Sequence, residues 1–445
     1  MTAFKLCLIL TGSVLVAAMT TLAVTQARLG SPMFFALSGA IGICYAIVLV
    51  VVSRRPPSHR LLLLALFFAV ACRVPLALEP VNYDSDMIRY IWDGRVQHFG
   101  YNPYAVLPAD PAMAHTHTAD TARMPSRFDR TPYPPAAQLF FRAIVFLNEA
   151  PLTMKLALLA CDVLTIFFLA RWLRVTGRNE WLVLVYAWNP LVILEAGHSS
   201  HIDVLGTFWI TLSAYCLARG RTAWASVAFT LSVATKLLPV VLLPLFIGRV
   251  RRRDILLGTA VLVALYLPFT FGSTVPVGAI PNVVAQVRFN SPVFRPLAWV
   301  ITPAGAAAFA LLVGFGTAVW ARRHLDAQDP AAWAWPMALA LACAPVIYPW
   351  YLLYVTPFLF ARSTAPLIVW TCTTIPVYVV WERARQGFRW RVPWELMVIE
   401  YGLVLIAMVV VMRAAPSTGV NWRRLLILQR ASKVTSAARD SERVM

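Results

Sequence analysis

Long apolar runs separated by short polar connections fill most of this chain. The continuous runs lie near residues 6–25, 33–53, 61–79, 153–172, 180–196, 202–218, 255–271, 296–319, 364–381 and 394–412. Most are close to the roughly 20 residues that a membrane-spanning helix needs. Two longer stretches, 222–248 and 331–361, are interrupted, and each predicts two short segments. The pattern predicts an all-α polytopic membrane protein with about 12 to 14 transmembrane segments, in which residues 1–412 form one integral-membrane domain.

The composition agrees with membrane insertion and argues against several other classes of protein. The 445-residue chain is 60% hydrophobic and 13% charged, whereas soluble domains carry about 25% charged residues. Its net charge is +19, but the basic residues cluster between apolar runs and in the tail 413–445. This distribution is typical of cytoplasmic loops that face anionic lipid, and nucleic acid is not an expected partner. All seven cysteines lie in apolar runs, so neither a disulfide framework nor a metal cluster is predicted.

Arginines between the runs predict which loops share one side of the membrane. The positive-inside rule places three basic clusters, near residues 54–60, 171–178 and 249–253, in the cytoplasm together with the basic tail. The first long loop 80–134, the turn 197–203 and the loop 272–295 then share the extracytoplasmic side. The connection from Glu382 to Trp394 is predicted on that side too, but its four arginines break the rule.

The first long loop contains a stretch that predicts a short helix with a reactive face. Ser85 is a good N-cap, and an acid at Asp86 suits the first turn of a helix. Four side chains then fall at i, i+3, i+4 and i+7 on one face: Asp86, Arg89, Tyr90 and Asp93. Three apolar residues, Ile88, Ile91 and Trp92, fall on the opposite face, which suits a helix that lies along the membrane surface. The pattern is equally compatible with a solvated, salt-bridged surface helix.

Further candidates lie in loops of the same predicted side, which favours chemistry at an interface over a transport path inside the membrane. They are Asp84, Arg95, Tyr133, Gln138, Glu195, His198, His201, Asp203, Lys236, Arg288 and Tyr348–Tyr351. Lys236 stands alone among apolar residues and needs an anionic partner, either a bound phosphate or a loop carboxylate.

Several of these candidates have simpler interpretations. His198, His201 and Asp203 lack a further strong ligand for zinc, so we expect them to bind or orient substrate, or to cap the next helix. Tyr133 precedes two prolines that could merely end the loop. Trp350 and Tyr351 also suit an interfacial aromatic belt.

Five motifs, in this order along the chain, resemble those of bacterial GT-C glycosyltransferases. The first runs through Asp86, Arg89-Tyr90, Trp92-Asp93-Gly94-Arg95-Val96, Gly100 and Asn102-Pro103-Tyr104. The others are Tyr133-Pro134-Pro135-Ala136-Ala137-Gln138, Glu195 with Gly197-His198 and His201-Ile202-Asp203, Thr235-Lys236-Leu237-Leu238-Pro239, and Tyr348-Pro349-Trp350-Tyr351. The chain departs from the family pattern at Ser85, where the family often has a second acid next to Asp86.

The resemblance implies a GT-C-like fold whose large first loop carries surface helices and the catalytic residues. It implies inverting transfer of a hexose, most often mannose, from a polyprenyl-monophosphate sugar to a hydroxyl of a lipid or glycan acceptor. Asp86 inherits the position of the catalytic base, with Asp84 as the alternative. Lys236, Arg89 and Arg288 are the expected phosphate ligands. The expected substrate-binding residues are Tyr90, Asp93, Arg95, Tyr133, Gln138, His198, His201, Asp203, Trp350 and Tyr351.

The expected setting is the inner membrane, with the site on its periplasmic side. No cofactor is expected, and a divalent metal is optional because a monophosphate is already a good leaving group. A flippase or transporter of lipid-linked sugars is the alternative, since it too needs a cationic site beside a lipid groove, but it does not need Asp86. A non-catalytic membrane scaffold is a third possibility.

Overall fold

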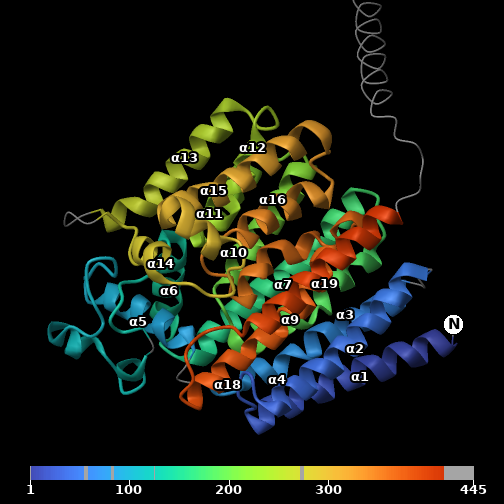
Figure 1. The fold of residues 1–445 in the computed structure, drawn as a ribbon, viewed down its shortest axis with the longest axis horizontal. Helices are drawn as coiled ribbons and strands as arrows, with labels where there is room; N and C mark the ends of the chain where they lie inside the picture. Colours follow the sequence, from blue (N-terminus) through green and yellow to red (C-terminus); the bar gives the residue numbers. More distant parts are fainter. Residues whose placement is uncertain (1, 55–58, 82–84, 125, 271–274, 415–445) are drawn as a thin grey trace, which may run out of the picture.

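The computed structural model describes residues 2–54, 59–81, 85–124, 126–270 and 275–414, and these residues form a helical bundle (Figure 1). Asp84 and the tail from residue 415 onward lie outside the described residues. The described part contains no strand, only an isolated bridge between Phe289 and Val346. The predicted all-α class is therefore confirmed.

Seven helical segments among the described residues are long and apolar enough to cross a membrane. They are Phe4–Thr25 in α1 (Thr2–Thr25), Pro32–Ser53 in α2 (Pro32–Arg54), His59–Leu78 from α3 (His59–Ala71) and α4 (Arg73–Leu78), α7 (Pro151–Val175), α15 (Phe294–His324), Arg362–Arg385 containing α17 (Ala365–Thr373) and α18 (Val379–Arg385), and α19 (Trp394–Arg413). The other predicted segments form shorter or broken elements. These include α10 (Asp203–Ala218), α11 (Thr222–Thr235), α13 (Arg252–Tyr266) and α16 (Pro330–Ala342). The total of 12 to 14 membrane segments stays a prediction.

Both predicted interruptions are present. α11 ends at Thr235, Lys236 adopts an extended backbone, and the chain continues in the 3₁₀ turn η5 (Leu238–Leu242) and α12 (Leu243–Phe246). α16 ends at Ala342, and the 3₁₀ segment η7 (Pro349–Phe358) follows Tyr348. Each interruption brings a polar or aromatic loop between two short apolar segments. Such breaks are tolerated at membrane depth where they line a cavity in the protein.

The predicted run at 180–196 is also broken, which the hydropathy pattern did not reveal. It forms η3 (Glu180–Val183), α8 (Leu184–Ala187), α9 (Pro190–Ile193) and the π-helical turn η4 (Leu194–Ser199). Pro190 cannot donate an amide hydrogen to a continuous helix, and the Asn189 side chain instead caps α9 by accepting from Leu191 and Val192 amides.

Two of the basic clusters that were predicted to be cytoplasmic, 171–178 and 249–253, contact the connection between α15 and α16. Arg178 donates to the Gln328 carbonyl over 3.4 Å. The Arg249 guanidinium donates to the Leu325 carbonyl over 2.9 Å, and Arg322 donates to the Ile247 carbonyl over 2.8 Å. On the predicted extracytoplasmic side, the Ala279 amide donates to the Thr131 carbonyl, and the Ile202 amide donates to the Tyr90 hydroxyl. The loops predicted to share the extracytoplasmic side are thus in direct contact with one another.

The predicted helix of the first long loop is α5 (Asp86–His98), and the Ser85 hydroxyl caps it by accepting from the Met87 amide. The expectation that its apolar face lies on lipid headgroups is wrong. Trp92 is fully buried and donates from its indole to the Thr116 hydroxyl over 3.0 Å. The reason is that the rest of the loop folds back over α5 and encloses a small core of Ile88, Trp92, Val96, Met113 and Met124.

α5 also packs closely on α6 (Pro135–Leu147), the helix that follows the loop. A Cβ atom at Gly94 would lie 2.6 Å from the Phe141 carbonyl oxygen, so only glycine permits this approach. Tyr90 stacks on the Phe141 ring with centroids 4.6 Å apart. The helix that begins at Asp86 is therefore held from both sides.

Candidate functional site

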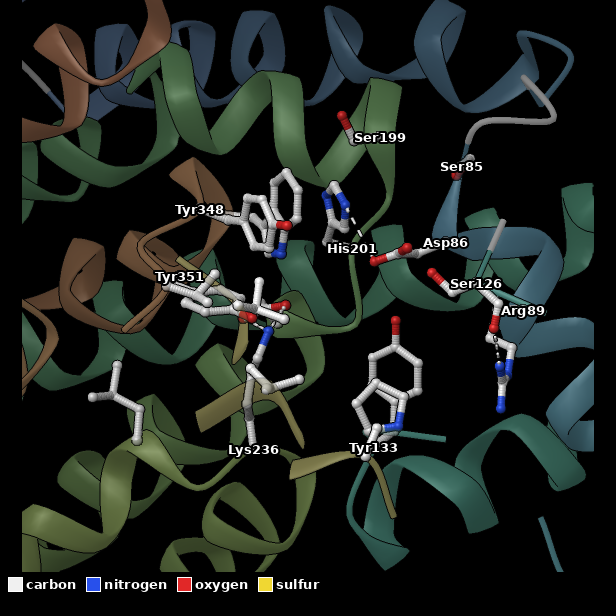
Figure 2. Close-up of a pocket in the computed structure, with 18 of the residues that line it drawn as sticks. Ser85, Asp86, Arg89, Ser126, Tyr133, Ser199, His201, Lys236, Tyr348 and Tyr351 are labelled. Carbon is white, nitrogen blue, oxygen red and sulfur yellow. Dashed lines mark hydrogen bonds and ion pairs between the residues drawn. The ribbon is translucent and has the colours of Figure 1, made fainter. Parts of the chain in front are cut away.

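A large cavity lies where the two interrupted segments, α5 and the turn 197–203 meet (Figure 2). Its volume is about 1110 Å³. One section is polar and is lined by Asp86, Arg89, His201, Asp203, Lys236 and Tyr351. Another section is apolar and is lined by Leu238, Val241, Val284, Ala310, Leu311 and Leu341, which come from η5, α14 (Ile280–Gln286), α15 and α16.

Asp86 is the first residue of α5 and reaches the polar section from the helix N-terminus. Its side chain is 39% exposed, and its carboxylate points toward His201 (Figure 2). Asp86 Oδ2 lies 3.8 Å from His201 Nε2. Asp86 is therefore an accessible carboxylate that a bound molecule in the cavity can reach.

His201 lies between two carboxylates and against an aromatic wall. Its Nδ1 is bonded to Glu195 Oε2, and its ring stacks on Trp350 with centroids 3.8 Å apart. Trp350 stacks in turn on Tyr348 at 4.5 Å. The pKa of His201 is raised above its ordinary value: burial would lower it, but the negative charges of Glu195, Asp86 and Asp203 outweigh burial. His201 therefore holds a positive charge to a higher pH than an exposed histidine does.

Lys236 has a carboxylate partner in the protein. Its ammonium lies 2.7 and 2.8 Å from the two oxygens of Asp203, and 3.8 Å from the centroid of the Tyr351 ring. Asp203 is buried, whereas the Lys236 side chain is 22% exposed and lines the cavity. Of the two partners considered from sequence, the loop carboxylate is present, and the bound phosphate stays a prediction.

Arg89 and Asp93, which were expected to bind phosphate and substrate, instead form an internal ion pair along one face of α5. Arg89 Nε lies 2.7 Å from Asp93 Oδ1, and Arg89 Nη1 donates to the carbonyls of Ser126 and Asp129. Asp93 is fully buried and also accepts from the Thr131 hydroxyl and the Gln138 amide. This network holds the loop that follows α5 against that helix. The Asp93 carboxylate is paired within the network and does not face the cavity.

Other predicted site residues divide between the cavity wall and places outside it. Tyr133, His198 and Trp350 line the cavity. Tyr90, Asp93, Arg95, Gln138 and Arg288 do not. Arg95 instead pairs with Glu149 at 2.6 Å, and Arg288 donates to carbonyls at the end of α14. Any contact of these five residues with substrate stays a prediction.

Sequence reasoning missed a second polar group on the cavity wall. Glu79 accepts from His198 over 2.7 Å, and the Lys155 ammonium donates to the carbonyls of Leu76 and Glu79. Lys155 is a lone cation in an apolar run, which is the same feature that drew attention to Lys236. Arg385, one of the four arginines that break the positive-inside rule, also lines the cavity. Aromatic rings complete this wall at Trp381 and Trp390, whose centroids lie 4.7 Å apart.

Metal ligands do not converge in the described part of the chain: no three side chains of His, Cys, Asp or Glu are grouped so that they could hold an ion. Charged and titratable side chains do line the cavity, among them Asp86, His201 and Lys236.

Residues 3–252 match a protein family described as alpha-(1->6)-mannopyranosyltransferase, N-terminal domain. This stretch includes α5, the turn 197–203 and Lys236. No curated protein and no solved structure matches the chain.

Proposed function

Because the chain belongs to the alpha-(1->6)-mannopyranosyltransferase family, and is thus a membrane mannosyltransferase, we propose that its donor is a polyprenyl-monophosphate mannose. In this proposal mannose is transferred with inversion to a hydroxyl of a lipid or glycan acceptor on the extracytoplasmic side of the inner membrane. The observation that carries the proposal is the cavity itself, which joins an accessible carboxylate and a lysine to an apolar section. A nucleotide sugar has no use for the apolar section, whereas a prenyl chain does.

The apolar prenyl chain of the donor fits the apolar section of the cavity, and its sugar phosphate fits the polar section. The prenyl chain lies against the apolar side chains of α14, α15 and α16, and its phosphate lies at Lys236. Asp203 holds the Lys236 ammonium at the cavity wall, where it stabilises the negative charge that develops on the leaving phosphate. The mannose then lies in the polar section between Lys236 and Asp86.

The transfer step needs one base and no general acid. As the acceptor oxygen attacks C1 of mannose, Asp86 takes the hydroxyl proton. The bond from C1 to the phosphate oxygen breaks, and its electron pair leaves with the phosphate. With a β-linked donor, this single displacement gives the α-linked product that the family description names.

The acceptor enters beside a further group of cavity residues in this proposal. This group consists of Glu79, His198, Trp381 and Trp390. Aromatic rings and hydrogen-bonding side chains suit a sugar, because its faces are apolar and its edges carry hydroxyls. The exposed position of Asp86 lets a hydroxyl approach it.

A transfer assay with purified protein tests the proposal. Decaprenyl-phospho-[¹⁴C]mannose and GDP-[¹⁴C]mannose are offered separately with octyl α-mannoside as acceptor. We expect transfer from the lipid donor alone and an α-(1→6) linkage in the product. Asp86→Asn should lower transfer by about a hundredfold or more. Asp110→Asn is the matched control, because asparagine can still accept the hydrogen bond that Asp110 accepts from the Ala112 amide. Transfer from GDP-mannose, or an unaffected Asp86→Asn variant, would contradict the proposal.

A further inference from the structure

Three side chains at the cavity form a continuous chain from the protein interior to the proposed base. Glu195 is fully buried and bonds His201 Nδ1, while His201 Nε2 faces Asp86 across 3.8 Å. Asp86 is the outermost of the three and the most exposed. Both nitrogens of one imidazole are thus directed at carboxylates, one inside the protein and one at the reacting position.

The backbone of this turn is built to hold the imidazole in place. Residues 194–199 form the π-helical turn η4, and Ser200 has a left-handed φ of 52°. The His201 amide therefore returns to the Glu195 carbonyl over 3.2 Å. π-helical turns are rare and occur frequently at functional sites. Next along the chain, the Ile202 amide donates to the Tyr90 hydroxyl of α5.

Further packing fixes the orientation of the ring relative to Asp86. Trp350 covers one face of the imidazole, with the two planes 11° apart. The Tyr90 contact ties the turn to the same helix that carries Asp86, four residues away. A histidine that only stabilised this turn would need the bond to Glu195 but not the second nitrogen facing the cavity.

We propose that His201, held by Glu195, is a positioning residue that keeps Asp86 ionised and directed at the acceptor hydroxyl. This inference rests on the proposed function of Asp86 as the base. During transfer the acceptor proton moves to Asp86, and His201 neither gains nor loses a proton. The positive imidazolium favours the carboxylate form of Asp86 before each transfer.

The charged surroundings of His201 are consistent with this role. The charged groups that act on His201 are the anions Glu195, Asp86 and Asp203. Asp86 itself also interacts with the cation Lys236 and with four phenols: Tyr90, Tyr133, Tyr348 and Tyr351. Burial raises the pKa of Tyr348 to about 12 and also raises that of Tyr133, so these phenols stay neutral. Among the described residues, His201 is the basic side chain that lies within 4 Å of the Asp86 carboxylate.

The test compares His201→Gln and Glu195→Gln by the pH dependence of single-turnover transfer. Loss of the imidazolium in His201→Gln should move the acidic limb of the rate–pH profile to higher pH by about one unit, the usual effect of one nearby charge. Donor affinity should change less than about threefold, because the phosphate lies at Lys236. Glu195→Gln keeps the imidazole but removes the buried anion beside it. The alkaline limb of the rate–pH profile of this variant should therefore move to lower pH, toward the ordinary histidine pKa. A uniform loss of rate at every pH, with neither limb moved, would overturn the proposal.

A second measurement does not depend on transfer at all. Infrared titration of the carboxyl band that disappears in Asp86→Asn reports the protonation of Asp86 in substrate-free protein. Its midpoint should rise by about one pH unit in His201→Gln, and an unchanged midpoint would refute the positioning role. If wild-type protein transfers no mannose but the midpoint still shifts, the proposed function fails and the link between His201 and Asp86 stands.

Discussion

Replacing Asp93 with asparagine should loosen the loop that covers α5 without removing Asp86, the proposed base. Asp93 is fully buried and accepts from Arg89 at 2.7 Å, Thr131 at 2.6 Å and Gln138 at 2.8 Å. Asparagine has the same size but no charge, and it offers one acceptor oxygen where aspartate offers two. The variant therefore leaves the Arg89 charge buried without its partner.

The size of the effect follows from these contacts. Removing one member of a buried ion pair costs about 3–5 kcal/mol, and the acceptor that remains offsets about 1–2 kcal/mol of that loss. A net loss of about 1–4 kcal/mol corresponds to a roughly 5- to 700-fold larger open population, since each 1.4 kcal/mol is a factor of ten. The opening should be local, because Asp93 joins α5 to residues 131 and 138 and not to the rest of the bundle.

Hydrogen exchange followed by mass spectrometry measures this opening directly. Peptides from α5 and from residues 126–138 should exchange faster by about the factor given above, whereas peptides from α7 should be unchanged. Asp110→Asn, in the same loop but at an exposed cap, should exchange like wild type. Unchanged exchange in Asp93→Asn, combined with a loss of transfer as large as in Asp86→Asn, would refute the structural role and make Asp93 the reacting carboxylate.

Four further outcomes are expected. In Asp86→Asn, single-turnover transfer should fall by about a hundredfold or more, while a binding assay should show nearly unchanged donor affinity. Lys236→Ala should weaken donor binding and turnover, and Lys236→Arg should retain more of both because the charge survives; near-normal activity in both would make Lys236 purely structural. The pKa of His201 is raised above 6.5. Its ion pairs therefore contribute stability that is complete below pH 6.5 and is lost as the pH rises through the raised pKa. The apparent Tm should fall over that pH range in wild type but not in His201→Gln. The proposed topology can be tested by labelling in a protein without its native cysteines. An impermeant maleimide is added to cells with a permeable outer membrane and an intact inner membrane, and it should label Ala119→Cys but not Arg323→Cys. The reverse pattern would invert the proposed topology.

Local physical chemistry explains what could be predicted from the sequence. Hydropathy and run length depend only on neighbouring residues, so the all-α membrane class and the breaks at Lys236 and Tyr348 were predictable. The same holds for the start of α5, because the Ser85 cap bonds an amide two residues away. The pairing of Arg89 with Asp93 belongs to this group as well, since both lie on one turn of one helix.

Partners that are distant in sequence are a different matter. A lone lysine in an apolar run indicates that its charge needs a partner. The partner, Asp203, lies 33 residues earlier and could be identified only from the packing of α10 against α11. Arg73 and Asp162 are both fully buried and pair across 89 residues, and nothing near either residue in the sequence indicates the other. Burial of an unpaired charge is costly, so folding must bring such groups together, but the sequence does not say which ones.

The surroundings of the proposed base were likewise decided by tertiary structure. The periodicity of α5 separated Trp92 from Asp86 correctly, but only the folded loop determined that protein, not lipid, covers Trp92. His201 faces Asp86 from 115 residues away along the chain. The sequence by itself therefore determined the class, the breaks at Lys236 and Tyr348 and the start of α5, because local hydropathy and hydrogen bonding specify them. Tertiary structure decided which charges meet and where the cavity lies, because hydrophobic burial has no direction and does not by itself select which apolar faces pack together.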